Sequence, residues 1–250
     1  MYLKDKIALI TGGSRGIGRA ISLALAREGA TVIINYLRKK SAAEEFGELL
    51  GSKGYKYKFI KGNIEDETEI DRICSEIEHE FGRIDILVSN AVFGVVKPIS
   101  GQKRKFLEKT INTNAASLLT LTQKMVSMRG FKGGNIVAVT SLGGRRVLKD
   151  YSVIGTSKAA LEALVRYIAV EYGYAGIRAN AISPGVVETE ALDNFPDKEK
   201  MIRTTIDKTP LGRLATPEDA AELAVFLCSE RSRMITGELI NIDGGYSIVG

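Results

Sequence analysis

Glycines at three positions of one short segment could bring a phosphate group against the main chain. Residues 11–18, Thr-Gly-Gly-Ser-Arg-Gly-Ile-Gly, follow an apolar run and open a helical pattern. Gly12 would allow a sharp turn, Gly16 would let the backbone approach a pyrophosphate, and Gly18 would let the helix pack closely on the strand. Free N–H groups at the start of the helix, with its positive dipole end, would then face the phosphates.

The spacing of these glycines is G-x-x-x-G-x-G, which differs from the common G-x-G-x-x-G dinucleotide motif. Alone it also fits a glycine-rich turn that binds no ligand. Because the turn joins a strand to a helix within a βαβ unit, we expect it to bind a dinucleotide. The candidate cofactor-binding residues of this turn are Gly12, Ser14, Arg15, Gly16, Ile17 and Gly18.

The residues after the second apolar run would lie beside the adenosine ribose. An acidic residue roughly 20 positions after the glycines would bind the ribose 2′-hydroxyl of NAD(H). Residues 35–40 are Asn-Tyr-Leu-Arg-Lys-Lys, without a carboxylate, and Arg15 adds another cation. Cations offer charge-assisted donors to a 2′-phosphate. We therefore expect NADP(H) rather than NAD(H), with Arg38 and Lys39 as ligands; the alternative is a solvated basic face before a helix.

Short apolar runs alternate with helical patterns along the chain. The runs are rich in β-branched residues without clean alternation, which suits strands covered on both faces. They span residues 7–11, 31–36, 57–60, 84–89, 135–140, 177–182 and 238–242, and helical patterns include 15–28, 67–81 and 152–172. This order predicts an α/β fold of the Rossmann type, a doubly wound parallel sheet with helices on both faces.

We expect residues 1–250 to form a single dinucleotide-binding and catalytic domain, because no internal repeat or Pro/Ser-rich linker divides the chain. A polar stretch from about 188 to 214 interrupts the alternation of strands and helices. Open α/β sheets bind ligands at the carboxyl ends of their strands. We therefore expect this stretch to cover the substrate at that edge of the sheet.

Composition argues against several other classes of protein. Hydrophobic residues make up 44% and charged residues 26%, and no apolar run approaches the roughly 20 residues that span a bilayer. The net charge of +5 is small and scattered, which argues against a nucleic-acid partner. Cys74 and Cys228 form no CxxC pair, and His79 is the single histidine, so we expect no metal site. The cysteines and the lack of an apolar leader predict a cytoplasmic protein.

Several further motifs are similar to those of the short-chain dehydrogenase/reductase family, over nearly the whole chain. Beside the glycine turn they are Gly62-Asn63-Ile64, Ser89-Asn90-Ala91, Asn112-Thr113-Asn114, Ser141, Ser183-Pro184-Gly185-Val186-Val187-Glu188-Thr189 and Asp243-Gly244-Gly245. The resemblance implies active-site roles for Asn114 and Ser141. It implies further cofactor contacts at Asn63, Ile64, Asn90, Ala91, Pro184, Gly185, Val187 and Thr189. Ser89 and Val92 depart from the family's usual Asn-Asn-Ala-Gly turn.

The family's catalytic helix normally carries Tyr-x-x-x-Lys, and this chain departs from that spacing. Four residues before Lys158 stands Ile154, which cannot donate a proton, and Tyr151 stands seven residues before it. The Tyr-x6-Lys spacing and residues 155–164 resemble the divergent branch of enoyl-acyl-carrier-protein reductases, above all the NADPH-dependent type III. Seven helical steps return Tyr151 to within about 20° of Lys158, about 10.5 Å away along the axis. A phenol set back in this way could meet an oxygen remote from the carbon that accepts hydride.

The resemblance therefore implies an NADPH-dependent oxidoreductase that reduces the C2–C3 double bond of a 2-enoyl thioester. Tyr151 would stabilise the enolate, and Lys158 would bind the nicotinamide ribose and favour the anionic form of Tyr151. Asn114 would support a water or backbone near Lys158, and Ser141 would position the substrate or only line the pocket. One alternative is a 3-oxoacyl (carbonyl) reductase of the same family, which the Pro184-Gly185 pair favours. The other is a non-catalytic NADP-binding protein.

The same resemblance implies a homotetramer built partly on the Tyr151–Lys158 helix, with an acyl thioester on acyl carrier protein as substrate. An acyl tunnel or ordinary packing would equally explain Phe195, Met201, Ile202 and Ile206. Weak candidates for contact with an acidic carrier protein are Lys198, Lys200, Arg203, Lys208, Lys103, Arg104, Lys105, Arg145 and Arg146. The signal from residues 193–208 is weak because Asp193, Asp197, Glu199 and Asp207 lie among the basic side chains.

Overall fold

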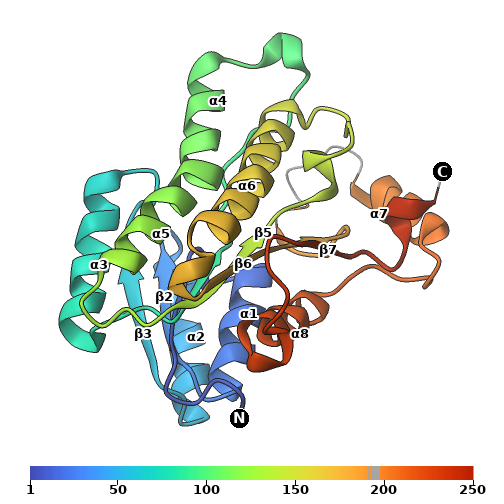
Figure 1. Ribbon diagram of the computed structural model, residues 1–250. Helices are drawn as coiled ribbons and strands as arrows, with labels where there is room; N and C mark the ends of the chain where they lie inside the picture. Colours follow the sequence, from blue (N-terminus) through green and yellow to red (C-terminus); the bar gives the residue numbers. More distant parts are fainter. Residues whose placement is uncertain (191, 193–197, 250) are drawn as a thin grey trace.

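Seven strands form one parallel sheet in the order β3-β2-β1-β4-β5-β6-β7 (Figure 1). The computed structural model describes residues 1–190, 192 and 198–249. The strands are β1 (Ile7–Ile10), β2 (Thr31–Tyr36), β3 (Tyr57–Lys61), β4 (Ile86–Ser89), β5 (Gly134–Val139), β6 (Ile177–Pro184) and β7 (Leu239–Ile242). The predicted fold class is confirmed, and every expected strand forms with its ends shifted by one or two residues at most.

Strand β1 is the point where the direction of sheet building reverses. Ile10 pairs with Ile34 of β2 on one side and with Val88 of β4 on the other. The chain adds β2 and β3 outward from β1, and then returns to place β4 against its opposite edge. Connections leave β1 and β4 in opposite directions, so a crevice opens at their carboxyl ends. The segments after β1 and β4 must therefore supply a ligand site.

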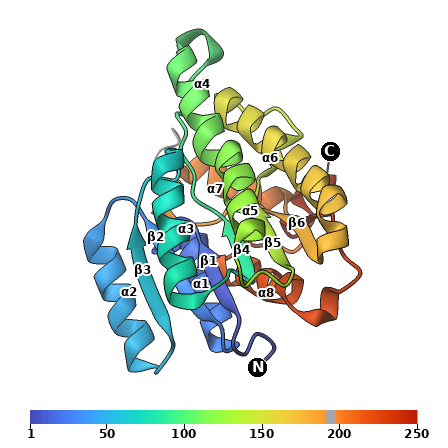
Figure 2. The same ribbon diagram turned by 60° about the vertical axis from the view of Figure 1, so that its left-hand side comes forward.

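Helices cover both faces of the sheet (Figure 2). One layer comprises α1 (Gly16–Arg27), α2 (Lys40–Ser52) and α8 (Pro217–Cys228). The other comprises α3 (Glu67–Phe81), α5 (Ser117–Ser127) and α6 (Ser152–Glu171). Helix α4 (Arg104–Ile111) runs into α5 through the π-helical turn η2 (Asn112–Ala116). Single 3₁₀ turns are η1 (Ile99–Gly101), η3 (Leu142–Gly144), η4 (Gly173–Ala175), η6 (Glu230–Ser232) and η7 (Tyr246–Ile248).

Alternate residues of each central strand face opposite helical layers. In β1, Leu9 packs with the α3, α5 and α6 side, while Ala8 and Ile10 pack with the α1, α2 and α8 side. Strand β2 divides in the same way, with Ile33 on one side and Ile34 on the other. A strand buried on both faces needs apolar residues at every position, which explains the unbroken apolar runs of the sequence. The two cores hold the strand ends, and hence the site, in fixed register.

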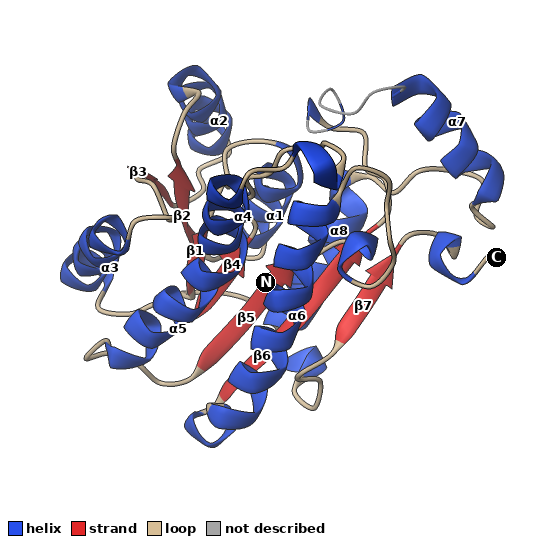
Figure 3. Ribbon diagram, turned by 90° about the horizontal axis from the view of Figure 1, so that it is seen from above, coloured by secondary structure: helices blue, strands red, loops and turns tan. Residues whose placement is uncertain are grey.

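The segment at 188–214 contains helix α7 (Lys198–Lys208), which lies at the edge of the molecule beside the C-terminus (Figures 1 and 3). Its carboxyl end contacts the turn after β7, because the Leu211 N–H donates to the Gly244 carbonyl at 3.2 Å. A Cβ added at Gly244 would lie 2.6 Å from Thr209 Cγ2, so glycine is needed for this contact. No helix in the described part of the chain is long and apolar enough to cross a bilayer.

Candidate active site

Two glycines with left-handed backbone conformation and hydrogen bonds from Asn90 shape the glycine turn after β1. Gly12 and Gly16 have φ of +61° and +52°, a region that L side chains rarely adopt. Asn90, which follows β4, donates its Nδ2 hydrogens to the carbonyls of Thr11 (2.9 Å) and Gly12 (3.0 Å). A Cβ at Gly18 would lie 2.4 Å from Asn90 Nδ2. Gly18 therefore lets α1 approach the turn and Asn90, whereas we expected close packing on the strand itself.

The amino end of α1 is open toward the crevice. Its N-cap residue is Arg15, in extended conformation, and no side chain of the described residues caps the first turn. Ser14 is buried, and Ser22 Oγ contacts the turn by donating to the Gly13 carbonyl at 3.3 Å. The first turn carries no acidic residue that would repel an anion. These groups fit the pyrophosphate of a dinucleotide, because backbone N–H groups and the helix dipole both favour an anion there.

Two of the three basic residues predicted near a 2′-phosphate, Arg15 and Lys39, lie around one carboxylate. Arg15 Nη1 and Lys39 Nζ approach the same oxygen of Glu190, at 2.8 and 2.6 Å. The two cations lower the pKa of Glu190, Lys39 by more than Arg15. Arg38 is exposed and forms no ion pair among the residues that the structure describes. Sequence reasoning missed Glu190, since its position beside these cations depends on the path of the chain after β6.

The Pro184–Gly185 turn brings the segment after β6 over the glycine turn. The Gly185 N–H donates to the Ile242 carbonyl at 2.9 Å, which ties the turn to the end of β7. Val187 is buried and pairs with Ala215. A Cβ at Gly16 would lie 3.6 Å from Thr189 Cγ2. The structure thus brings the predicted residues Gly16 and Thr189 together, although they are far apart in sequence.

Asn63 and Ile64 follow β3, two strands away from the glycine turn. Asn63 Oδ1 accepts a hydrogen bond from the Glu65 N–H at 3.3 Å, and Ile64 is buried. Asn35, at the end of β2, links the two regions by donating to the Gly62 carbonyl at 3.0 Å. The β3 turn therefore lies at the carboxyl edge of the sheet with the other candidate cofactor residues.

Tyr151 is the residue immediately before α6, and its hydroxyl points to Ser141 at the end of β5. The Tyr151 hydroxyl and Ser141 Oγ lie 3.3 Å apart. The tyrosine ring lies against Gly143, where an added Cβ would come within 2.5 Å of the ring. Burial raises the pKa of Tyr151, and the hydrogen bond from Ser141 opposes that rise. The phenol is therefore protonated at neutral pH and can donate a hydrogen bond.

Lys158 of α6 is buried, and its side chain reaches the carboxyl end of β5. Its Nζ donates to the Val139 carbonyl at 2.7 Å. Burial lowers the pKa of Lys158 to about 8, and the carboxylate of Glu162 acts in the opposite direction. Burial raises the pKa of Tyr151, and our expectation that Lys158 favours the anionic form of Tyr151 stays a prediction. The ammonium is held close to the end of β5.

Glu162 is a buried carboxylate that sequence reasoning missed. It accepts a hydrogen bond from Thr140 Oγ1 at 2.7 Å, and Arg145 Nε lies 3.9 Å from the same oxygen. Its separation of four residues from Lys158 places both on one face of α6, a signal that the sequence does contain. Arg145 also donates to Asn241 Oδ1 at 2.7 Å, so this candidate for carrier-protein contact is occupied within the protein.

Asn114 lies in the π-helical turn η2 and joins two segments of the site. Its Oδ1 accepts from the Phe93 N–H at 2.8 Å, and its Nδ2 donates to the Phe93 carbonyl (3.0 Å) and to Ser157 Oγ (2.9 Å). The amide thus holds the chain after β4 against α6, next to Lys158. Ile154, at the family's usual tyrosine position, is buried against Gly94, where an added Cβ would lie 2.2 Å away.

The residues predicted to line an acyl tunnel are only partly placed. Met201, Ile202 and Ile206 of α7 are half-buried, which fits a channel wall and partial packing alike. Phe195, together with Asp193 and Asp197, lies outside the described residues. Among the basic candidates, Arg104 pairs with Glu108 on its own helix at 2.7 Å.

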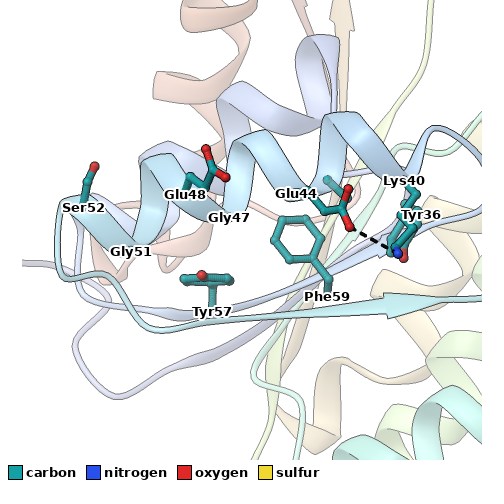
Figure 4. Close-up of a pocket in the computed structure, with 10 residues that line it drawn as sticks. Tyr36, Lys40, Glu44, Gly47, Glu48, Gly51, Ser52, Tyr57 and Phe59 are labelled. Carbon is teal, nitrogen blue, oxygen red and sulfur yellow. Dashed lines mark ion pairs between the residues drawn. The ribbon is translucent and has the colours of Figure 1, made fainter.

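A pocket lies between α2 and the strands β2 and β3 (Figure 4). Glu44 and Glu48 stand along it, and Glu44 pairs with Lys40 at 3.3 Å. Gly47 leaves room for the rings of Tyr57 and Phe59, because a Cβ there would lie 3.3 Å from Phe59. None of the residues that line the pocket belongs to the Tyr151 group, and its carboxylates disfavour a phosphate, so we exclude it from the candidate site.

A parallel sheet with a glycine-rich turn after β1 and a Tyr–Ser–Lys group after β5 defines the class of protein. The chain belongs to the short-chain dehydrogenase/reductase family and is an oxidoreductase of the kind that uses a nicotinamide cofactor. The family model that matches residues 12–247 is described as "Enoyl-(Acyl carrier protein) reductase".

The relatives include reductases of enoyl and of 3-oxoacyl substrates beside other oxidoreductases, such as a hydroxynaphthalene reductase-like protein. A 1-cyclohexenylcarbonyl-CoA reductase from Streptomyces collinus is 34% identical over 253 residues, covering 98% of this chain and 88% of the relative. A 3-oxoacyl-[acyl-carrier-protein] reductase from Thermotoga maritima is 33% identical over 249 residues, covering 99% of this chain and 100% of the relative. The crystal structure of the Bacillus cereus enoyl-acyl carrier protein reductase with NADP+ and indole naphthyridinone has a TM-score of 0.93 at 31% identity, covering 100% and 99% of the two chains.

Proposed function

We propose that this protein is an NADPH-dependent reductase of the C2–C3 double bond of a 2-enoyl thioester. The observation that carries the proposal is the pair of groups at the amino end of α6. A protonated phenol stands before the helix at Tyr151, and a buried isoleucine fills the position where a carbonyl reductase of this family carries its tyrosine. The family model and two of the relatives described above support an enoyl substrate.

The reduction adds one hydride to the β carbon and one proton to the α carbon, and the carbonyl oxygen carries negative charge in between. The bound nicotinamide supplies the hydride. Tyr151 donates a hydrogen bond to the thioester oxygen as charge develops there, and Ser141 orients the phenol at 3.3 Å. A raised pKa keeps the phenol protonated, so it can donate throughout. A proton from Tyr151 or from solvent then completes the product.

Lys158 and the segments at the strand ends would hold the cofactor. Lys158 Nζ, fixed by the Val139 carbonyl, would donate to the nicotinamide ribose, and Asn114 would keep the chain after β4 in place beside it. The Pro184–Thr189 turn would hold the carboxamide. The stretch at 188–214, including the half-buried Met201 and Ile206, would cover the acyl chain.

We infer a preference for NADPH from the basic group at the end of β2. Arg15 and Lys39 meet on Glu190, and Arg38 is exposed next to Lys39 in the sequence, so these cations are available to a 2′-phosphate. Arg38→Asp should weaken NADPH binding by at least tenfold, because a carboxylate repels the 2′-phosphate. It should change NADH binding little, because a carboxylate can accept a hydrogen bond from the ribose 2′-hydroxyl. Dissociation constants from quenching of protein fluorescence would measure both. Equal weakening of NADPH and NADH would contradict this assignment.

A second candidate, reduction of a 3-oxoacyl thioester, is compatible with the same Ser141–Tyr151 contact. The Ser141–Tyr151 hydrogen bond at 3.3 Å could position a ketone for protonation as well as it orients the phenol toward an enolate. The Thermotoga maritima relative is named for that activity. The discriminating experiment is oxidation of NADPH with crotonyl and with acetoacetyl thioesters, each on coenzyme A and on acyl carrier protein. Turnover of crotonyl alone supports the enoyl reductase, and turnover of acetoacetyl alone overturns it.

A further inference from the structure

One carboxylate from the segment after β6 lies between the two cations that flank the glycine turn. Glu190 Oε2 is 2.8 Å from Arg15 Nη1 and 2.6 Å from Lys39 Nζ. The three residues come from the glycine turn, from the start of α2 and from the segment that follows β6. Thr189, the preceding residue, is in contact range of Gly16, so the main chain itself brings Glu190 to this position.

The environment of Glu190 is what a 2′-phosphate would require. An oxyanion held by an arginine and a lysine at hydrogen-bond distance occurs both in carboxylate pairs and in phosphate sites. Both cations are about half exposed, and so is Glu190, so an incoming ligand can reach them. A phosphate and the Glu190 carboxylate cannot share the two cations without strong repulsion, since like charges a few Å apart repel.

We propose that Glu190 is a specificity-determining residue that occupies the 2′-phosphate site as an internal anion and must leave it when NADP(H) binds. This inference rests on the NADPH preference proposed above. NADH carries a hydroxyl instead of the phosphate, and a carboxylate beside the ribose can accept a hydrogen bond from it. Glu190 therefore reduces the difference between the affinities for NADPH and NADH. It does so although residues 37–40, directly after β2, contain no carboxylate.

The test isolates the 2′-phosphate by comparing two fragments of the cofactor. Binding of adenosine 2′,5′-bisphosphate and of adenosine 5′-monophosphate is measured by calorimetry on the full chain, for the wild type and Glu190→Gln. The matched control is Glu188→Gln, which removes one exposed carboxylate from the same segment without touching Arg15 or Lys39. We expect Glu190→Gln to bind the bisphosphate about fivefold more tightly, in line with the modest strength of exposed ion pairs, and the monophosphate unchanged.

Three results would overturn the inference. If the wild type prefers the bisphosphate and Glu190→Gln binds it no more tightly, Glu190 does not compete, and the proposed NADPH preference stands alone. If Glu188→Gln tightens binding as much as Glu190→Gln, only the overall charge matters. If neither the wild type nor Glu190→Gln distinguishes the two fragments, the inference and the NADPH preference fail together. A preference that emerges only in Glu190→Gln supports the inference, because it shows a site that the carboxylate had masked.

Discussion

Lys158 is a buried cation whose surroundings disfavour its charge. Its pKa falls to about 8 in the folded protein, against 10.5 for an ordinary lysine, and Glu162 limits the fall. Sites that tune a cation in this way are often functional, since a group near its titration point responds to a ligand that brings or removes charge. The hydrogen bond to the Val139 carbonyl keeps the ammonium in place at the end of β5.

The depressed pKa makes Lys158 a source of pH-dependent stability. Between about pH 8 and 10.5 the unfolded chain binds a proton that the folded protein has released, so the free energy of unfolding rises with pH. The rise attributable to Lys158 should reach roughly 3 kcal/mol. Urea unfolding of wild type and Lys158→Met from pH 7.5 to 10.5 would measure it as a difference between the two proteins.

The comparison with Lys158→Met is needed because buried cysteines titrate in the opposite sense. Burial raises the pKa of both Cys74 and Cys228 to about 12, so they retain protons that the unfolded chain has lost. Their contribution lowers stability above pH 9 in both proteins and cancels in the difference. A difference that stays constant across the whole range would show that Lys158 is not depressed.

The sequence indicated residues of the candidate site better than it indicated the side chains that contact them. The spacing of Tyr151 and Lys158 was sufficient to place both at one end of α6, because a helix repeats its faces predictably. Glu190 could not be placed, since its contact with Arg15 depends on how the chain turns after β6. The sequence also could not predict that the pKa of Tyr151 is raised, because burial of the phenol is a property of the folded protein.

At the scale of elements, the approach of α1 to the strand ends depends on Gly18. An added Cβ would lie 2.5 Å from the Gly12 carbonyl oxygen, which is main chain and cannot rotate away. Gly18→Ala should therefore push α1 off the turn, lower the free energy of unfolding by about 1–3 kcal/mol and weaken cofactor binding at least tenfold. Chemical denaturation and cofactor titration measure the two effects.

A matched control is Gly101→Ala, because an added Cβ at Gly101 of η1 meets nothing within 4 Å and its φ is not in the left-handed region. This variant should keep wild-type stability and cofactor affinity. If Gly18→Ala behaved as Gly101→Ala does, the close approach of α1 to Asn90 would not matter for the turn.

The strands were the most predictable elements, and α7 the least. Strands β1 to β6 each carry buried residues between the two helical layers, so their apolar runs stand out from the polar turns. Helix α7 has Thr205 as its one buried residue and many charges, so the helical spacing of Met201, Ile202 and Ile206 was a weak signal. The expectation of a polar insertion over the sheet edge therefore identified the stretch at 188–214 but did not predict helix α7 within it.

At the scale of the whole molecule, the outer face of α6 carries apolar side chains exposed to solvent. Val170 is 80% exposed and Tyr167 65% exposed, and Tyr174 of η4 follows them at 89%. Neighbouring α5 adds Leu119, which is 40% exposed. Tyr167 and Val170 are three residues apart and so share one face of α6, and exposed apolar faces are typical of protein–protein contacts. We propose that this face joins copies of the chain in a homotetramer.

Introducing a charge on this face should separate the copies. Val170→Asp is expected to shift the mass measured by light scattering from about four chains to two or one, because burying an unpaired carboxylate in an interface is unfavourable. Val147→Asp is the control, since Val147 is 99% exposed in the loop before α6 and is not part of that helix. A tetramer retained by Val170→Asp, or a wild type that is already monomeric, would refute the proposed interface.

The phenol of Tyr151 is the group on which the proposed chemistry depends most directly. Turnover of crotonyl thioester at saturating NADPH, measured for wild type and Tyr151→Phe, isolates it, because phenylalanine keeps the ring against Gly143 and removes only the hydroxyl. We predict a fall in kcat of about 100-fold or more with an unchanged Kd for NADPH, as for loss of a donor to an oxyanion. Wild-type turnover by Tyr151→Phe would contradict the account.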